Sequence, residues 1–244
     1  LANFTALAAA RHAVLRRMGW DVESQGLFGA PELPVIVGAD AHNTIFKALA
    51  MLGLGRDRVI RVPMDAQGRI RPGMLPDLPG PAIVCIQQGN VNSGAFDPAG
   101  PVIEWARARN AWVHVDGAFG LWARATPSRA QLAAGVEGAD SWATDAHKWL
   151  NVPYDCGIAL VRDKSALRGA MGTGAAYLQE SPVREPMHYT PELSRRARGV
   201  EVWAALKTLG RSGVADLVER SCRHASRFAE GLRESGFEVM NEVV

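Results

Sequence analysis

Short apolar runs alternate with segments of helical pattern over the first 165 residues of the chain. Runs of this kind, bounded by Gly and Pro, predict strands that are buried on both faces of a sheet. They are 34–38 (PVIVG), 58–62 (RVIRV), 82–86 (AIVCI), 111–116 (AWVHVD), 139–144 (ADSWAT) and 157–161 (GIALV). Helices are predicted between them, over 3–18, 42–52 and 101–110. The pattern predicts an α/β fold with a mostly parallel sheet covered by helices on both faces.

The pattern changes after about residue 193. Helices are predicted over 195–209 and 214–235, followed by a strand over 237–244. We therefore expect a large domain over 1–193, and over 194–244 a linking helix and the start of a small C-terminal domain. The first residue is not Met and the final strand lacks a partner, so both ends are expected to lie inside a longer protein.

Composition narrows the class of protein. Of the residues, 48% are apolar and 21% charged, which is typical of a globular chain. A net charge of +2 is too small to favour nucleic acid or an anionic membrane as partner, and no apolar stretch approaches the length of a membrane span. Three unevenly spaced cysteines fit neither a disulfide framework nor a zinc site, so a cytoplasmic location is expected.

The run 144–150 (TDAHKWL) carries the first chemical signal. The amine of Lys148 can form a Schiff base with an aldehyde cofactor such as pyridoxal phosphate. The neighbours His147 and Trp149 suggest an enclosed site, in which desolvation would lower the pKa of the amine. The alternative is a surface lysine on a turn.

Asp116 carries the second signal, at the end of an apolar strand. A carboxylate in that place can keep a pyridine nitrogen protonated, and the small residues Gly117 and Ala118 would let a flat ring approach the backbone. Ligands of parallel sheets bind beyond the carboxyl ends of the strands, where both Asp116 and Lys148 are expected. The alternative is a turn aspartate that caps the next helix.

Other residues at strand ends could contact the same ligand. His42, at a strand-to-helix junction, could stack on a cofactor ring or could simply begin the helix. Asn92, in the polar loop 88–97, could contact the cofactor or a substrate carboxylate. His114, Asp116 and His147 lack further ligands at suitable spacing, so no metal site is expected. A nucleophile elbow, a P-loop and a dinucleotide fingerprint are missing from the sequence.

Together these motifs resemble the group II pyridoxal-phosphate-dependent decarboxylases, the family of aromatic-amino-acid, histidine and glutamate decarboxylases. The matching runs are 41–42, 90–97 (NVNSGAFD), 114–119 (HVDGAF), 145–156 (DAHKWLNVPYDC) and 194–196. The resemblance implies fold type I, the aspartate-aminotransferase-like architecture. It also implies pyridoxal 5'-phosphate as cofactor, a small-molecule amino-acid substrate, and an obligate homodimer with active sites at the subunit interface.

Roles follow from the resemblance position by position. Lys148 would be the Schiff-base lysine, Asp116 the partner of the pyridine nitrogen and His42 the ring-stacking residue. Ala118 would contact the other ring face, with Thr144 and His147 near the phosphate. Three departures stand out: the family's Gly-Ser phosphate cradle lies just upstream of Ala2-Asn3, the lid stretch 180–191 is shorter, and most of the small domain is absent. Tyr189 or His188 could take the lid's role as proton donor.

The predicted activity is decarboxylation of an L-amino acid, through an internal aldimine on Lys148 and a quinonoid intermediate. Class V aminotransferases and cysteine desulfurases share part of the 115–118 and 147–148 motifs, but the continuation 149–155 favours the decarboxylases. Aldehyde-synthase or carbon–carbon lyase chemistry stays open because the lid residue decides the final step. A truncated, non-catalytic homologue is the third alternative.

Overall fold

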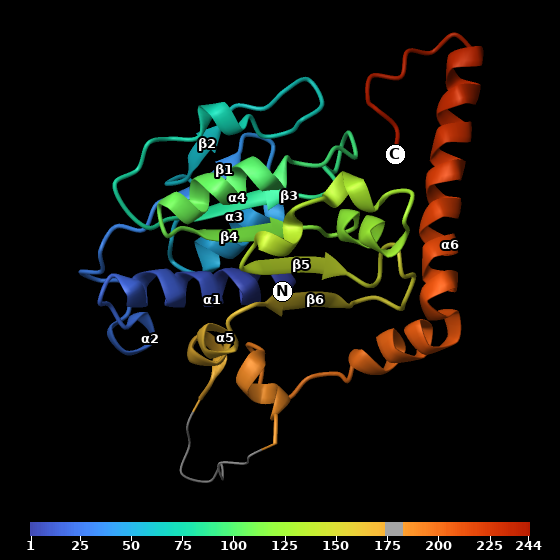
Figure 1. The fold of residues 1–244 in the computed structure, drawn as a ribbon. Helices are drawn as coiled ribbons and strands as arrows, with labels where there is room; N and C mark the ends of the chain where they lie inside the picture. Colours follow the sequence, from blue (N-terminus) through green and yellow to red (C-terminus); the bar gives the residue numbers. More distant parts are fainter. Residues whose placement is uncertain (174–182) are drawn as a thin grey trace.

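A six-stranded sheet forms the centre of the computed structural model, which describes residues 1–173 and 183–244 (Figure 1). The strand order is β2-β1-β3-β4-β5-β6, and every neighbouring pair is parallel except β5 and β6. The strands are β1 (Val35–Gly38), β2 (Ile60–Val62), β3 (Ile83–Gln87), β4 (Trp112–Asp116), β5 (Ser141–Asp145) and β6 (Gly157–Val161). The predicted mostly parallel α/β sheet is therefore confirmed, with one antiparallel edge strand.

Helices cover both faces of the sheet, as predicted. Alternate residues of β1, β3 and β4 point to opposite sides, and each side forms its own apolar cluster. One cluster packs under α1 (Ala2–Arg17), α3 (Asn43–Met51) and α5 (Lys164–Met171). The other packs under α4 (Ala99–Ala108) and two 3-10 segments, η3 (Ala130–Ala133) and η4 (Val136–Gly138). The strands are continuous apolar runs because both of their faces are buried.

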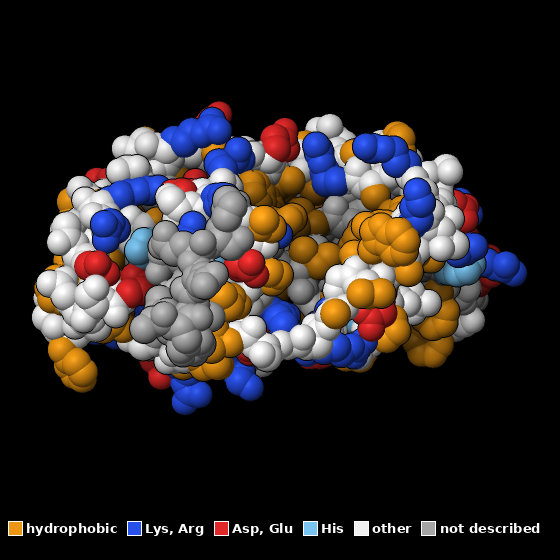
Figure 2. All heavy atoms as spheres, turned by 90° about the horizontal axis from the view of Figure 1, so that it is seen from below, with side chains coloured by type: hydrophobic (Ala, Val, Ile, Leu, Met, Phe, Trp, Pro, Cys, Tyr) orange, Lys and Arg blue, Asp and Glu red, His pale blue; other side chains and the backbone are white. Residues whose placement is uncertain are grey.

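Short elements complete the described chain. They are α2 (Val22–Gln25) and the 3-10 segments η1 (Pro72–Met74), η2 (Gly120–Ala125) and η5 (Pro186–Tyr189). None of the helices in the described ranges is long and apolar enough to cross a membrane. The underside of the molecule is hollowed, with hydrophobic side chains gathered around the hollow on the side where α6 (Gly199–Glu234) runs (Figure 2).

The predicted helices 195–209 and 214–235 form the single long element α6, which is broken at Gly210. Gly210 has φ 62° and ψ −176°, a conformation that glycine adopts readily, so two helices meet there at a kink. The predicted start at residue 195 is wrong. Arg196 and Arg198 instead lie in a non-helical segment, where they donate to the backbone oxygens of Tyr154 and Asp155.

The predicted strand 237–244 is also wrong. These residues form no strand, and both Phe237 and Met240 are exposed, at 63% and 76%. A strand needs a neighbour to accept its ladder of hydrogen bonds, and the tail has none among the described residues. It is held by side chains instead: Gln67 donates to the oxygen of Met240, and Asn241 donates to the oxygen of Ser93. The boundary expected between 193 and 194 stays a prediction.

Candidate active site

The carboxyl ends of three strands meet at one cavity of about 480 Å³. β1 leads to His42, β4 ends at Asp116, and β5 ends just before the turn that carries Lys148. This volume lies within the range typical of small-molecule sites, roughly 300–1,000 Å³. The cavity is lined by Leu1, Ala2, Asn3, Phe4, His42, Thr44, Lys47, Ala48, Met51, Asp116, Ala118, Ala143, Thr144, Asp145, His147 and Lys148. The structure thus brings together six of the eight site residues predicted from the sequence.

Asp116 is buried at the back of this cavity. Its Oδ2 accepts a hydrogen bond of 3.1 Å from Asn3 Nδ2, while its Oδ1 is buried without any partner among the described residues. Burial raises the pKa of Asp116, against the opposing effects of the Asn3 hydrogen bond and of the nearby His42 and Lys148. A buried carboxylate oxygen normally accepts a hydrogen bond, and the protonated nitrogen of a pyridine ring could donate one to Oδ1.

Lys148 lies at the open side of the cavity. The sequence suggests an enclosed lysine, and this is wrong: its side chain is 37% exposed. Lys148 Nζ is 3.0 Å from Asp145 Oδ2, and it lies 5.9 Å from the centre of the Phe119 ring. The lysine is more open than expected because its neighbours His147 and Trp149 are themselves only partly buried and do not enclose it. A carboxylate counter-ion, rather than desolvation, dominates its surroundings.

His147 and Thr144 flank the lysine turn. The ring of His147 is fixed by the backbone of Cys156, whose oxygen and nitrogen lie 2.9 and 3.0 Å from Nδ1. Its Nε2 is 3.7 Å from Asp145 Oδ2. Thr144 is buried in β5, and its Oγ1 has no hydrogen-bond partner among the described residues. Both side chains therefore lie at the cavity wall, and the Thr144 hydroxyl is available there for a further hydrogen bond.

His42 combines both of the roles considered for it. It is the N-cap of α3, where its Nδ1 accepts from the Thr44 backbone N–H at 3.3 Å, and it also lines the cavity. Ala118 lies on the segment after β4, and its oxygen accepts from the backbone N–H of Asp145 at 2.8 Å. That bond ties the end of β4 to the end of β5, so Asp116 and the lysine turn are held at a fixed separation.

Two predicted residues lie outside this cavity. Asn92 lines a neighbouring cavity of about 940 Å³, which shares the His42 and Lys47 walls with the first. Tyr189 is buried in the apolar cluster under α1, with the Arg184 guanidinium 4.5 Å from its ring centre. The role of proton donor predicted for Tyr189, or for His188, stays a prediction. Part of the predicted lid, residues 180–182, lies outside the described ranges.

Two residues of the cavity were missed by the sequence reasoning. Asn3 contacts Asp116 although 113 positions separate them, and only the docking of α1 on the sheet brings them together. Asp145 is the counter-ion of Lys148 and precedes it by three residues. The spacing of three residues between Asp145 and Lys148 is present in the sequence. A carboxylate so close to the lysine amine was the signal that could have identified Asp145.

The cavity has the chemistry that pyridoxal phosphate requires. An amine (Lys148), an unpaired buried carboxylate oxygen (Asp116) and a flat ring (His42) face one space. The first turn of α1 also lines it, and the N-terminus of a helix favours anions such as phosphate. Within the described ranges, no cluster of three or more His, Cys, Asp or Glu side chains could hold a metal ion.

Comparison with solved structures places this fold in a known class, the fold type I pyridoxal-phosphate-dependent proteins. The Oryza sativa TDC solved with PLP and tryptamine superposes with a TM-score of 0.83 and is 30% identical. The match covers 95% of this chain and 50% of that one. The expected aspartate-aminotransferase-like architecture is thereby confirmed.

The chain belongs to the pyridoxal-dependent decarboxylase family, whose conserved domain matches residues 1–244. Tryptophan decarboxylase 1 of Oryza sativa subsp. japonica is 31% identical over 98% of this chain and 49% of its own length. Acidic amino acid decarboxylase GADL1 of Bos taurus is 29% identical over 91% of this chain and 46% of its own length. The chain spans about half the length of these curated relatives.

Proposed function

We propose that the protein containing this chain is a carboxy-lyase that releases carbon dioxide from an L-α-amino acid, with pyridoxal phosphate bound in the 480 Å³ cavity. The observation that carries the proposal is the opening of Lys148 and the unpaired Oδ1 of Asp116 into one space. When bound, the cofactor supplies an aldehyde that bonds to amines and a pyridinium ring that accepts the electron pair left by the departing carboxylate. Family membership supports this choice among pyridoxal-phosphate reactions.

Each cavity residue has a role in this proposal. Lys148 Nζ would bond the aldehyde carbon, and Asp116 Oδ1 would hold the proton of the ring nitrogen through a charge-assisted hydrogen bond. His42 would stack on the ring, and Ala118, having no side chain beyond Cβ, would leave room for it. Thr144 and His147 would bind the phosphate together with the first turn of α1. Asn92, from the neighbouring cavity, would contact the substrate.

Asp145 completes the set as the carboxylate that moves a proton at Lys148. An ammonium is not a nucleophile, so Lys148 has to lose a proton before its amine can attack. Asp145 Oδ2, at 3.0 Å from Nζ, is placed to exchange that proton. His147 Nε2, 3.7 Å from the same oxygen, steadies the carboxylate when the lysine has moved away.

The substrate is proposed only as a class. The relatives include a tryptophan decarboxylase and an acidic amino acid decarboxylase, whose names point to side chains of different size and charge. We further propose a homodimer in the cytoplasm. The cavity is open on the side of Lys148, which a partner subunit could close, and the three cysteines are free and buried, which suits a reducing compartment. Light scattering on the purified protein and cell fractionation test these two points.

The main experiment traps the cofactor on the protein. Incubation with pyridoxal phosphate followed by borohydride reduction should leave the cofactor's mass on the peptide that contains Lys148. Lys148→Ala should trap none and should lower carbon dioxide release from amino acids by about 10³-fold or more, on the order seen when a covalent catalytic group is removed. Lys164→Ala, which changes a lysine in α5 away from the cavity, is the matched control.

Product analysis separates the alternatives. An amine and carbon dioxide in equal amounts from one of the common L-amino acids support the proposal. An aldehyde product would instead indicate an aldehyde synthase, and a keto acid an aminotransferase. Cofactor trapped on another lysine, or equally in Lys148→Ala, would contradict the proposed role of Lys148.

A further inference from the structure

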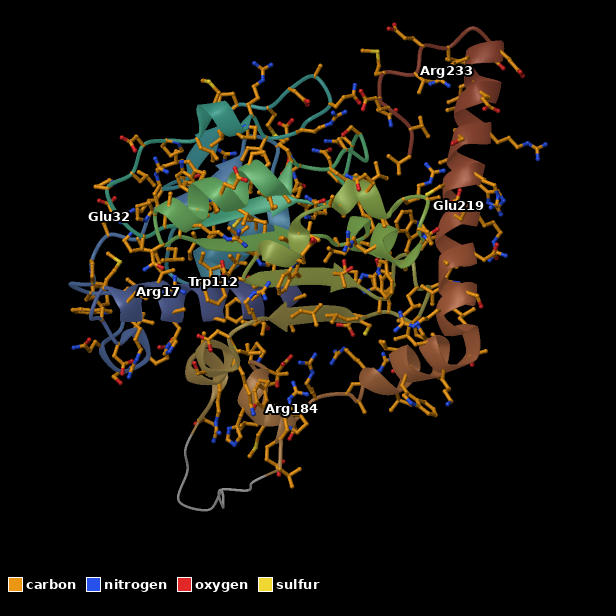
Figure 3. All side chains as sticks on the ribbon, viewed as in Figure 1. Arg17, Glu32, Trp112, Arg184, Glu219 and Arg233 are labelled. Atoms are coloured by element: carbon orange, nitrogen blue, oxygen red, sulfur yellow. The ribbon has the colours of Figure 1, made fainter. Side chains whose placement is uncertain are left out.

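A continuous chain of side-chain hydrogen bonds runs behind the cavity, beneath the sheet. It begins at Trp112, which lies beside Arg17 where α1 crosses β4 (Figure 3). Trp112 Nε1 donates to Ser141 Oγ at 2.8 Å, and Ser141 Oγ lies 2.9 Å from His114 Nδ1. All three of these strand residues, from β4 and β5, are buried.

The chain continues through α1 to the cavity. His114 Nε2 lies 3.0 Å from Asn3 Oδ1. Asn3 Nδ2 lies 3.1 Å from Asp116 Oδ2 and 3.1 Å from Thr44 Oγ1. Thr44 Oγ1 in turn lies 2.8 Å from His42 Nδ1. Asn3 is therefore the branch point that joins the buried His114 to both Asp116 and His42.

We propose that Asn3 is a positioning residue, which points its two amide protons at Asp116 and Thr44 and thereby fixes the carboxylate and the imidazole that face the cofactor. The inference concerns the site of the proposed function and rests on it. The three contacts of Asn3 are all made with side chains, and the backbone N–H of Thr44 donates to His42 Nδ1.

The direction of the bonds follows from Asp116 and from the single proton of a neutral His114 ring. An ionised Asp116 can only accept, so Asn3 presents its amide nitrogen there and its Oδ1 to His114. His114 Nε2 then donates to Asn3 Oδ1, which leaves Nδ1 without a proton. The indole N–H of Trp112 can only donate, so Ser141 Oγ accepts from it and gives its own proton to His114 Nδ1.

The second branch fixes His42 in the same way. His42 Nδ1 accepts from the Thr44 backbone N–H, so it carries no proton there and also accepts from the Thr44 hydroxyl, whose oxygen accepts from Asn3. The remaining proton of a neutral His42 ring must lie on Nε2. The two branches have two consequences for the cavity: Asp116 Oδ2 is occupied, so Oδ1 is the oxygen left for the ring nitrogen, and the His42 ring is held in one orientation.

The first test reads the tautomers directly in the protein without cofactor. Long-range ¹H–¹⁵N correlation spectra of histidine-labelled protein should show the proton of His114, and that of His42, on Nε2. In Ser141→Ala the hydroxyl at His114 Nδ1 is gone but Asn3 Oδ1 still accepts from Nε2, so we expect the proton to stay on Nε2 and the Nδ1 chemical shift to change. Ser221→Ala, which removes a hydroxyl bonded only within α6, should leave both rings unchanged. Observation of His114 as Nδ1–H in the unaltered protein would overturn the proposal.

The second test uses the size-matched variant Asn3→Asp. The introduced carboxylate can still accept from His114, but it turns an acceptor toward Asp116 and Thr44. We expect the dissociation constant for pyridoxal phosphate to rise about tenfold or more, the cost of roughly one lost hydrogen bond, and the His42 signals to shift. Affinity equal to that of the unaltered protein would overturn the inference alone. Failure of the unaltered protein to trap cofactor on Lys148 would contradict the proposed function and leave the tautomer result standing.

Discussion

At the scale of single residues, two buried ionisable groups give the molecule opposite responses to acid. Burial lowers the pKa of His114 to about 3, from an ordinary value of 6.5. Burial also raises the pKa of Asp97 to about 6, although its carboxylate accepts from the backbone N–H groups of Ile70 and Gln87. The folded chain therefore resists protonation at His114 and favours it at Asp97. The two groups have opposite effects on how the free energy of unfolding changes with pH, so variants are needed to measure each effect separately.

His114 should make the molecule sensitive to acid. Below about pH 6.5 His114 binds a proton in the unfolded chain but not in the folded chain. The free energy of unfolding therefore falls by up to about 1.4 kcal/mol for each unit by which the pH is lowered. His114→Gln should lack this contribution to the slope between about pH 6.5 and 4. Urea denaturation of both proteins at several pH values measures it, and His224→Gln, at an exposed position of α6, is the control. Parallel slopes for His114→Gln and the unaltered protein would contradict the prediction.

Residues that line the cavity could be predicted where they end a strand or lie in a recognisable motif. Asp116 follows a run of apolar residues, and Lys148 lies in a motif with recognisable neighbours, so the sequence indicated that both face one site. Asn3 could not be found in this way, because its partners come from β4 and α3 and only the folded chain brings them together. The exposure of Lys148 was predicted wrongly because a local motif does not reveal which way its turn opens.

At the scale of elements, the segment after β4 packs unusually close to the segment after β3. A Cβ added at Gly120, at the start of η2, would lie 2.0 Å from the backbone oxygen of Gln88. Backbone atoms cannot move aside as the end of a flexible side chain can, so this contact requires glycine. The close approach holds the loop after β4 against the carboxyl end of β3.

Gly120→Ala should destabilise the fold by about 3 kcal/mol, because a methyl group would be forced into a packed backbone. Gly231→Ala is the matched control: it lies in α6 with open space around its Cα, and alanine should stabilise that helix by roughly 0.5–1 kcal/mol. Thermal denaturation of both variants measures the difference. The prediction is wrong if Gly120→Ala melts at or above the temperature of the unaltered protein.

Elements could be predicted where their pattern was strong. The apolar runs located all six strands, most clearly β1 and β3, whose residues are buried on both faces and almost all apolar. Helix α5 was missed, since it is only eight residues long and buries just Ala166 and Leu167. The prediction of a strand over 237–244 was wrong because a strand requires a neighbouring strand, and the local apolar pattern does not show whether one is present.

At the scale of the whole molecule, α6 packs against the sheet domain along one apolar face, whose most buried part is a stripe of three residues. Val214, Val218 and Cys222 recur every four residues and are buried. Beside them Glu219 points from α6 toward the 3-10 segments (Figure 3), where it pairs with Arg129 at 3.3 Å and accepts from Ser128. Val214 shares its apolar cluster with Ala146 and Leu150, so this stripe packs against the turn that carries Lys148.

Val214→Asp should therefore release α6 from the lysine turn. A buried unpaired carboxylate costs several kcal/mol, and we expect about 3 kcal/mol of destabilisation together with faster tryptic cleavage within α6. Limited proteolysis followed by mass spectrometry locates the cleavage. Phe228→Asp, on the same helix but 71% exposed, should be cleaved at the normal rate. Equal rates for the two variants would show that the stripe does not hold the helix.

The long-range contact between Asn3 and Asp116 links binding in the cavity to folding. Because Asn3 and Asp116 are 113 positions apart, the complete cavity exists only when α1 is docked on the sheet. A ligand that binds only there stabilises the native state by mass action, by about 2.7 kcal/mol at a concentration roughly 100 times its dissociation constant. Free cofactor that binds this cavity would thus shift the folding equilibrium toward the state in which α1 is docked on the sheet.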